Sequence, residues 1–251
     1  MKLLKKLLII NWHYIFYELI EFEHINFLTG KNASGKSTII DALQLLILGD
    51  TSGYFFNKAA NDNSQRNLKG YLKGEVADDG ETGFIYLRDG IFSSYIAGEF
   101  FDTKKKQFFT FGVNFDVYHD EKPQHHFFLW EGPLPQNHFI ENDIPMNYQQ
   151  LRAFFKNQPK TRSQFFESNR SYQTTFKGKM GSLNDKFFNL FRKSVPFSPI
   201  MDIERFISEF VCDVTSRVDI SDMQDNIRYY KQLEHDVELV RERITRLEEV
   251  G

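Results

Sequence analysis

The sequence predicts an α/β fold that ends in the start of a coiled coil. Three observations predict it: a glycine-rich loop at residues 30–38 before an apolar helix pattern, a series of short strands between residues 83 and 130, and heptads after residue 219. The chain has 251 residues, of which 41% are hydrophobic and 26% charged, and this is ordinary for a globular protein. Its length suffices for one large domain and an appendage.

The glycine-rich loop fits the phosphate-binding pattern G-x-x-x-x-G-K-[ST], the P-loop, without a mismatch. Its two glycines let successive backbone N–H groups point inward toward phosphate oxygens. Lys36 then reaches the β- and γ-phosphates, and the Ser37 hydroxyl holds Mg²⁺. We therefore predict Lys36 as the catalytic residue, Ser37 as the metal ligand, and a nucleotide-binding set of Gly30, Lys31, Asn32, Ala33, Ser34, Gly35, Lys36, Ser37 and Thr38.

The motif requires a buried strand before the loop and a helix after it. The apolar run at residues 25–28 is predicted as that strand. Residues 38–48 are predicted as the helix, which stops at Gly49. A chance match would not bring both neighbours, so the context favours nucleotide binding.

The flanking segments follow simple patterns. Residues 3–10 and 15–23 are predicted as strands, and residues 50–74, rich in Asn, Ser, Gly and Lys, as a long loop with a short helix at residues 67–72.

We expect no cleavable signal peptide, and the sequence has no apolar stretch of about 20 residues. Cys212 is the single cysteine, as expected in a reducing compartment. We expect a cytoplasmic protein without membrane contact.

Short apolar runs alternate with turn residues in the next segment, as is typical of an antiparallel meander. The predicted strands are residues 84–87, 95–100, 108–117 and 127–130. We assign the many phenylalanines to the core and to cross-strand pairs rather than to a base-stacking surface. His119, His125 and His126 lack partners at metal-ligand spacing, so we interpret them as strand or surface residues.

Helices are predicted to dominate after a loop at residues 133–145. The candidates are residues 148–156, 182–194 and 202–214. Ser182 and Asp185 have the spacing of a capping box at the start of the second candidate.

The C-terminal segment has a heptad seam with charged residues between its apolar positions, which are Tyr230, Leu233, Val237, Val240, Ile244 and Leu247. An ordinary amphipathic surface helix is the alternative, since the repeat lasts only about three heptads. The pattern is still running at Gly251. We therefore expect the front part of a longer protein, divided into a head at residues 1–218 and the start of a coiled-coil arm at residues 219–251, whose helix needs a partner.

Two elements of a complete P-loop hydrolase are missing. No apolar strand is followed by Asp-Glu, the acidic motif that orients Mg²⁺ and water. No Ser-Gly-Gly signature of the kind used by ABC-type ATPases is present either. We expect this chain to bind nucleotide but not to hydrolyse it alone.

The P-loop with Asp41-Ala42-Leu43 behind it, the β-rich lobe and the heptads together resemble the N-terminal half of an SMC-like ABC ATPase head. Residues 11–12, 28–50, 197–210 and 218–220 are similar to the MukB/MksB branch, and most to the JetC family of Wadjet plasmid-defence systems. The resemblance implies a P-loop NTPase of ABC/SMC head type followed by an antiparallel coiled-coil arm. In that superfamily the Walker B and signature motifs lie beyond the arm and return to complete the head.

The resemblance also implies function and partners. It implies ATP and Mg²⁺ as cofactors, pairing with the C-terminal half of the same head, and a homodimer with a second SMC head. ATP hydrolysis would drive translocation or loop extrusion on double-stranded DNA, in defence against plasmids or in chromosome organisation. Further partners implied by resemblance are a kleisin, a winged-helix (KITE) subunit and a nuclease subunit.

Individual positions can be compared with such heads. Arg66 matches an arginine that approaches nucleotide or DNA, although an exposed loop arginine is an equal alternative. Ala33 stands where many relatives carry glycine, and we expect a helical or bridge conformation there. The glutamine of the usual Q-loop is not identified.

Charge gives a separate indication of DNA. Residues 152–193 contain ten basic and two acidic residues, a net charge of +8, whereas the whole chain carries −3 and the remainder therefore −11. Such asymmetry suits a phosphate-binding surface, with a solvated helical face as the alternative. The candidate DNA-binding residues are Lys156, Lys160, Arg162, Arg170, Lys177 and Lys179.

Three other functions stay open at this point. One is a self-contained P-loop kinase or GTPase, which the missing acidic motif and the heptads disfavour. Another is a non-catalytic scaffold that nucleotide merely locks. The third is an SMC-like DNA repair ATPase, whose arm would end in a zinc-binding cysteine pair.

Overall fold

The computed structural model describes residues 1–53, 56, 68–78, 84–119, 121–158 and 161–194, together with residues 230, 231, 234, 235, 237, 238 and 241. The chain divides into two units, Met1–Pro199 and Ile200–Gly251. The predicted boundary at residue 218 and the predicted helix at residues 202–214 lie outside the described residues.

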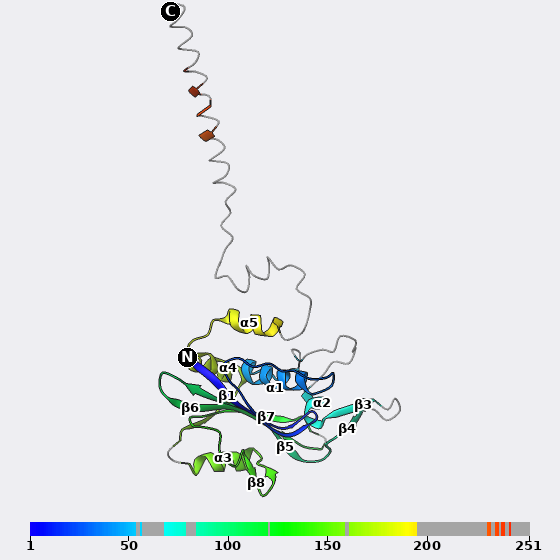
Figure 1. Cartoon of the computed structure of the whole chain (residues 1–251). Helices are drawn as coiled ribbons and strands as arrows, with labels where there is room; N and C mark the ends of the chain where they lie inside the picture. The colour runs from blue at the N-terminus through cyan, green and yellow to red at the C-terminus, as the bar shows by residue number, and fades with distance from the viewer. Residues whose placement is uncertain are drawn as a thin grey trace, which may run out of the picture. The chain divides into compact units, whose positions relative to one another are not determined.

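A six-stranded sheet in the order β10-β7-β6-β5-β1-β2 is the centre of the first unit, and all its neighbouring strands are antiparallel (Figure 1). Its strands are β1 (Lys2–Trp12), β2 (Ile15–Glu21), β5 (Phe92–Asp102), β6 (Gln107–Val117), β7 (Gln124–Trp130) and β10 (Ser163–Phe165). The predicted strands at residues 3–10, 15–23, 95–100, 108–117 and 127–130 are confirmed as parts of this sheet. The fold is therefore mixed α/β with a mostly antiparallel sheet.

Both faces of the sheet are covered, because alternate residues of a strand point to opposite sides. Leu7 and Ile9 of β1 pack in one cluster with α1 (Lys36–Leu48), α4 (Asn169–Lys179) and α5 (Asp185–Ser194). Leu8 and Ile10 pack in a second cluster with α3 (Tyr148–Lys156) and the hairpin of β8 (Ile140–Glu141) and β9 (Ile144–Pro145). Figure 1 shows α1 and α4 on one side of the sheet and α3 with β8 on the other.

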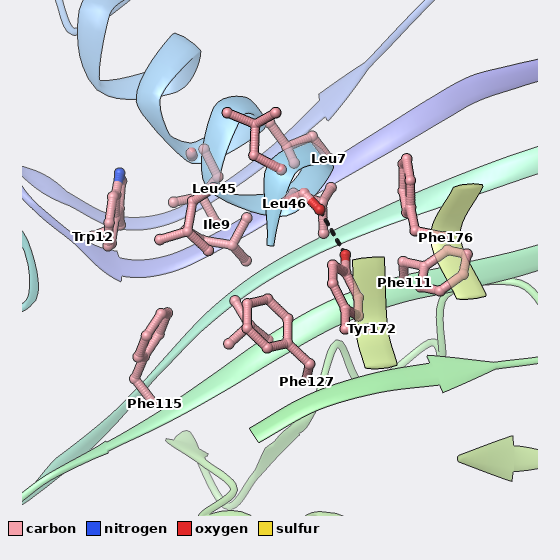
Figure 2. Close-up of a cluster of buried hydrophobic side chains, with 14 of the residues drawn as sticks. Leu7, Ile9, Trp12, Leu45, Leu46, Phe111, Phe115, Phe127, Tyr172 and Phe176 are labelled. Atoms are coloured by element: carbon pink, nitrogen blue, oxygen red, sulfur yellow. Dashed lines mark hydrogen bonds between the residues drawn. The ribbon is translucent and has the colours of Figure 1, made fainter. Parts of the chain in front are cut away.

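The first cluster is rich in aromatic side chains from the strands, as predicted for the phenylalanines. Tyr172 of α4 donates its hydroxyl proton to the carbonyl oxygen of Leu46 at 2.6 Å, and this bond joins α4 to α1 (Figure 2). Tyr172 is completely buried, and its ring stacks on Phe127 of β7 with 4.2 Å between the ring centroids. These contacts fix the C-terminal end of α1 over the sheet.

The prediction of a buried strand at residues 25–28 is wrong. This segment is irregular, and Ile25, Phe27 and Leu28 are 77%, 85% and 41% exposed. The apolar pattern suits a strand, but a strand also needs a hydrogen-bonding neighbour and a covering layer. None of the described residues provides a paired strand for this segment, and its apolar side chains are left exposed.

Several shorter elements also differ from the predictions. The strand expected at residues 84–87 is β4 (Phe84–Tyr86), which pairs with β3 (Glu75–Asp78) in a separate two-stranded sheet and not in the meander. The loop expected at residues 133–145 contains the β8–β9 hairpin. Its turn residues Asn142 and Asp143 have φ of 50° and 63°, the left-handed pair that tight hairpins prefer. The strands of the hairpin were too short to stand out in the sequence, and the pattern at residues 84–87 did not show which strand it would pair with.

The helices agree better with the sequence. The helices predicted at residues 38–48, 148–156 and 67–72 correspond to α1, α3 and α2 (Leu68–Lys73), whereas α4 had no prediction. The predicted capping box is wrong, because α5 begins at Asp185 and Ser182 has φ of 58°. Asn184 caps this helix instead, since its Oδ1 accepts from the backbone N–H of Lys186 at 3.0 Å.

Two heptad positions fall on described residues of the second unit. Tyr230 and Val237 are helical and 69% and 52% exposed. The other predicted seam residues lie outside the described part of the chain, so the coiled coil stays a prediction.

Replacing Gly112 with alanine is expected to destabilise the sheet by roughly 1–3 kcal/mol. A Cβ at this position of β6 would lie 2.8 and 2.9 Å from ring carbons of Phe128 on the neighbouring strand, and that ring is buried. Gly178→Ala is the matched control, because nothing lies within 4 Å of its Cβ position in α4 and alanine is the better helix former. Chemical denaturation should show a loss for the first variant and no loss for the second.

Candidate nucleotide-binding site

The loop at residues 30–35 has unusual backbone angles at its two glycines. Gly30 has φ of 154°, and Gly35 has φ of 87° and ψ of 2° directly before α1. The φ of Gly30 is one that residues with a Cβ rarely adopt, and a Cβ there would also lie 2.6 Å from Ser34 Oγ, so the turn favours glycine. Lys31, Asn32, Ala33 and Ser34 are exposed, and a ligand can therefore reach the loop from solvent.

Ala33 has φ of 64°, which is the left-handed region. The expected helical or bridge conformation is therefore wrong. A residue with a Cβ pays about 1–2 kcal/mol in this region, because Cβ approaches the following carbonyl oxygen. The loop holds this strain at the position where glycine would be unstrained.

Ala33→Gly is expected to raise the free energy of unfolding by roughly 0.5–1 kcal/mol, the relief of strain less the larger backbone entropy of glycine. Ala42→Gly is the control, since Ala42 is fully buried in the regular helix α1 and its loss should cost about 1 kcal/mol or more. Thermal unfolding measures both. A destabilised Ala33→Gly variant would contradict the strain assigned to this position.

Lys36 turns back over the loop. Its Nζ donates to the carbonyl oxygens of Gly30 and Lys31, each at 2.7 Å, and to Ser34 Oγ at 3.3 Å. The ammonium group thus lies against the loop that is predicted to bind phosphates. These bonds hold the loop closed around one positive charge.

The start of α1 offers donors to an anion. Gly35 provides no side-chain cap, and no acidic residue occupies the first turn. The first N–H groups of a helix have no intrahelical acceptor, and the helix dipole is positive at that end. This helix end is suited to phosphate, with the half-buried Ser37 in its first turn.

Trp12 holds the first turn of α1 in place. Its indole Nε1 donates to the carbonyl oxygen of Thr38 at 3.2 Å, and both side chains are buried. Its ring packs against Phe56, Tyr71 and Phe115. Thr38 therefore faces the core with its side chain, and it can serve a ligand only through its backbone.

Asp41 adds a second anchor. Its completely buried carboxylate accepts a hydrogen bond from the hydroxyl of Tyr71 in α2. No structural role for Tyr71 or Trp12 could be predicted from the sequence, because their importance comes from contacts between segments far apart in the chain. For Trp12 the sequence carried a signal in its place at the end of a predicted strand and in the family resemblance of residues 11–12.

Arg88 ties α2 to the β1–β2 turn on the same side of the molecule. Its Nε and Nη2 donate to the carbonyl oxygens of Leu72 and His13 at 2.9 and 2.6 Å. Burial lowers the pKa of the Arg88 guanidinium to about 10, and the group stays cationic at neutral pH. This cation at the C-terminal end of α2 satisfies carbonyls that a helix leaves unpaired.

The other predicted site residues are not gathered in one place. Arg66 and Lys160 lie outside the described residues. Lys156 is on α3 and Lys177 and Lys179 are on α4, on opposite faces of the sheet. Arg162 is exposed between these elements, and Arg170 is exposed in the first turn of α4. The basic segment of the sequence therefore does not lie on one face of the sheet, and its contact with DNA stays a prediction.

No cluster of three or more His, Cys, Asp or Glu that could hold a metal ion occurs in the part of the chain that the structure describes. The two carboxylates next to predicted strand ends are engaged elsewhere. Asp89 pairs with Lys73 at 3.4 Å, and Glu131 pairs with Lys179 at 2.6 Å. The candidate Mg²⁺ ligand is therefore the hydroxyl of Ser37, which follows Lys36 directly in the sequence.

The loop geometry, the open start of α1 and the sheet beneath it define a P-loop NTPase-like region. Residues 4–63 match the family described as the P-loop containing region of AAA domain. No curated protein matches the chain. Among the described helices, none is both long and apolar enough to cross a bilayer.

Proposed function

We propose that the chain is the ATP-binding half of an SMC-like motor head. The observation that carries the proposal is the P-loop with Lys36 on its carbonyls at the uncapped start of α1. The segment before this loop supports an incomplete head, because its apolar residues are exposed where a P-loop protein needs a buried strand.

ATP would lie on the loop with its phosphates toward the N–H groups at the start of α1. Lys36 would exchange its carbonyl partners for β- and γ-phosphate oxygens, to which an ammonium group binds more strongly. The Ser37 hydroxyl would hold Mg²⁺, which when bound neutralises the phosphate charge and favours attack on the γ-phosphate. The cofactors are thus ATP and Mg²⁺.

Hydrolysis would need a group from outside the described residues. A P-loop hydrolase uses a carboxylate at the end of a neighbouring strand to orient Mg²⁺ and water. Asp41, the carboxylate in α1, is buried in its hydrogen bond with Tyr71 and serves the packing of the helix. We propose that the C-terminal half of the same head supplies the acidic strand.

Residues 25–28 are the proposed contact for that half. Ile25, Phe27 and Leu28 expose apolar surface directly before the P-loop. A strand of the partner half that paired here would bury these side chains and place its own end beside the phosphates. A second head would then join across ATP, and the cycle of joining and release would move double-stranded DNA. A kleisin, a winged-helix subunit and a nuclease are the proposed further partners, in a cytoplasmic assembly.

ATP turnover tests this proposal. The chain should bind Mg·ATP alone and hydrolyse it only after the C-terminal half of the head is added, with further stimulation by circular DNA. Unaided hydrolysis, or phosphate transfer to a small molecule, would instead favour a self-contained kinase or GTPase. If a Lys36→Ala complex kept full function, nucleotide would be at most a structural lock. Turnover stimulated by DNA ends and not by closed circles would favour a repair ATPase.

A further inference from the structure

Lysines from three segments gather at one end of the sheet. Lys2 begins β1, the β5–β6 turn carries three consecutive lysines, and Lys179 ends α4. We call this surface the lysine end, and it consists of Lys2, Lys104, Lys105, Lys106 and Lys179. Only Lys179 belongs to the basic segment of the sequence, and the other four lysines lie far from it in the chain.

Direct contacts join the three segments. The backbone N–H of Thr103 donates to the Met1 carbonyl oxygen at 2.9 Å, which fixes the turn beside the start of β1. Lys2 Nζ lies 3.8 Å from the Cβ position of Gly181, immediately after α4. Lys179 Nζ lies 5.2 Å from the ring centroid of Phe109 in β6. Figure 1 shows the N-terminus beside α4.

The two carboxylates nearby each pair with one lysine of this surface, Asp102 with Lys2 at 3.8 Å and Glu131 with Lys179 at 2.6 Å, and they leave the three turn lysines unpaired. Asp102 is 7% exposed and accepts from the backbone N–H groups of Lys104 and Lys105 at 3.0 and 3.2 Å. These bonds lower the pKa of its carboxyl, so it stays ionised, but it faces the turn and not solvent. Glu131 uses both oxygens on Lys179, each at 2.6 Å.

The three turn lysines carry the free charge. Lys104, Lys105 and Lys106 are exposed, and none of them forms an ion pair with a described residue. Neighbouring ammonium groups repel one another by about 1 kcal/mol or less in water, and a bound polyanion would replace this repulsion by attraction. The remaining charge of the surface is therefore positive and accessible.

The composition fits a phosphate backbone better than a protein. Protein interfaces are depleted of lysine and centre on aromatic or aliphatic anchors. Here five lysines share the end of the sheet with two exposed large apolar side chains, Met1 and Phe108, which are 61% and 39% exposed. Flexible ammonium groups neutralise phosphates without reading bases.

The lysine end cannot serve the nucleotide. Trp12, at the other end of β1, contacts the first turn of α1, and the ten steps from Lys2 to Trp12 span about 33 Å of strand. ATP phosphates on the P-loop are thus out of reach of these lysines. The two basic features must bind different anions.

We propose that the lysine end binds the backbone of duplex DNA without sequence preference. This inference rests on the proposed function, since a motor head needs a DNA contact that leaves its nucleotide site free. The lysines would follow one strand of phosphates, with the turn lysines making the principal contacts.

The test uses the full chain and a short labelled duplex of mixed sequence, with affinity measured over a range of salt concentrations. Each phosphate contact contributes about 0.9 to the slope of log affinity against log salt. Lys104→Gln/Lys105→Gln/Lys106→Gln should therefore lower the slope by about two to three and weaken binding at least tenfold at low salt. Unfolding temperature and Mg·ATP affinity should be unchanged, because these side chains are exposed and distant from the loop.

Lys122→Gln/Arg152→Gln/Lys156→Gln is the matched control. It removes the same charge from exposed positions in the β6–β7 turn and on α3, away from the lysine end. If this control lowered the slope and the turn variant did not, DNA would bind the α3 side and the inference would be wrong. Binding of polyglutamate, but not of duplex, through the turn lysines would also overturn it in favour of an acidic protein partner. A wild-type chain that binds DNA through these lysines but binds no ATP would refute the proposed function alone.

Discussion

Replacing Lys36 with alanine is expected to weaken Mg·ATP binding by roughly tenfold to a hundredfold. A hydrogen bond to a charged group contributes about 1.5–3 kcal/mol, and each 1.4 kcal/mol is a factor of ten. The ammonium group already lies 2.7 Å from two loop carbonyls, so it needs only a short movement to reach phosphates. Calorimetric titration with a non-hydrolysable ATP analogue measures the loss.

Lys31→Ala is the matched control for this experiment. Lys31 is exposed in the same loop, and in the structure it supplies Lys36 with its backbone carbonyl, which alanine retains. Its loss should therefore change the affinity less than threefold. The role assigned to Lys36 would be wrong if both variants weakened binding equally. The unfolding temperature should stay within a few degrees of wild type in both, since neither side chain is in the core.

Trp12→Ala is expected to cost about 3–5 kcal/mol of stability and to weaken nucleotide binding as well. The side chain is completely buried, and large-to-small changes of aromatic residues in cores cost this amount. Figure 2 shows the ring on the side of the cluster that faces α1. The loss of its 3.2 Å bond to the Thr38 carbonyl releases the turn that carries the phosphate donors. Chemical denaturation and ATP titration measure the two effects.

Trp130→Ala separates the two effects. Trp130 is also buried, donates to the Pro133 carbonyl at 3.0 Å and stacks on Phe155, but it lies in the other cluster, away from α1. It should lose similar stability without a specific loss of ATP affinity among molecules that remain folded. If either alanine variant fails to fold, Trp12→Phe provides the test, because it keeps most of the ring and removes the indole donor for about 1 kcal/mol. Unchanged ATP binding in Trp12→Phe would show that the hydrogen bond does not position the loop.

The strength of local sequence signals decided what could be predicted. The P-loop and α1 follow from a nine-residue motif and a continuous apolar helix, and the meander follows from long strands separated by turns. The β8–β9 hairpin and β10 have two or three residues in each strand, which is too few for a period to appear. Helix α4 was missed because its apolar residues, chiefly Tyr172 and Phe176, are few among polar ones.

The pattern at residues 25–28 misled for a different reason. β-branched and aromatic side chains favour a strand, but they do not show that a neighbouring strand is available for pairing. Likewise, the sum of charges over residues 152–193 placed in one group lysines that the fold puts on opposite faces of a sheet. Both inferences took closeness in space from closeness in the chain.

The sequence by itself determined the phosphate-binding loop, its lysine and the helix behind it, because these depend on residues within about ten positions of one another. Only the tertiary structure decided that Trp12 and Tyr71 anchor that helix, that Ala33 is strained, and that Lys2, the β5–β6 turn and Lys179 share one end of the sheet. The physical reason is that antiparallel pairing joins residues as far apart as Lys2 and Asp102, and no local pattern records which strands will meet.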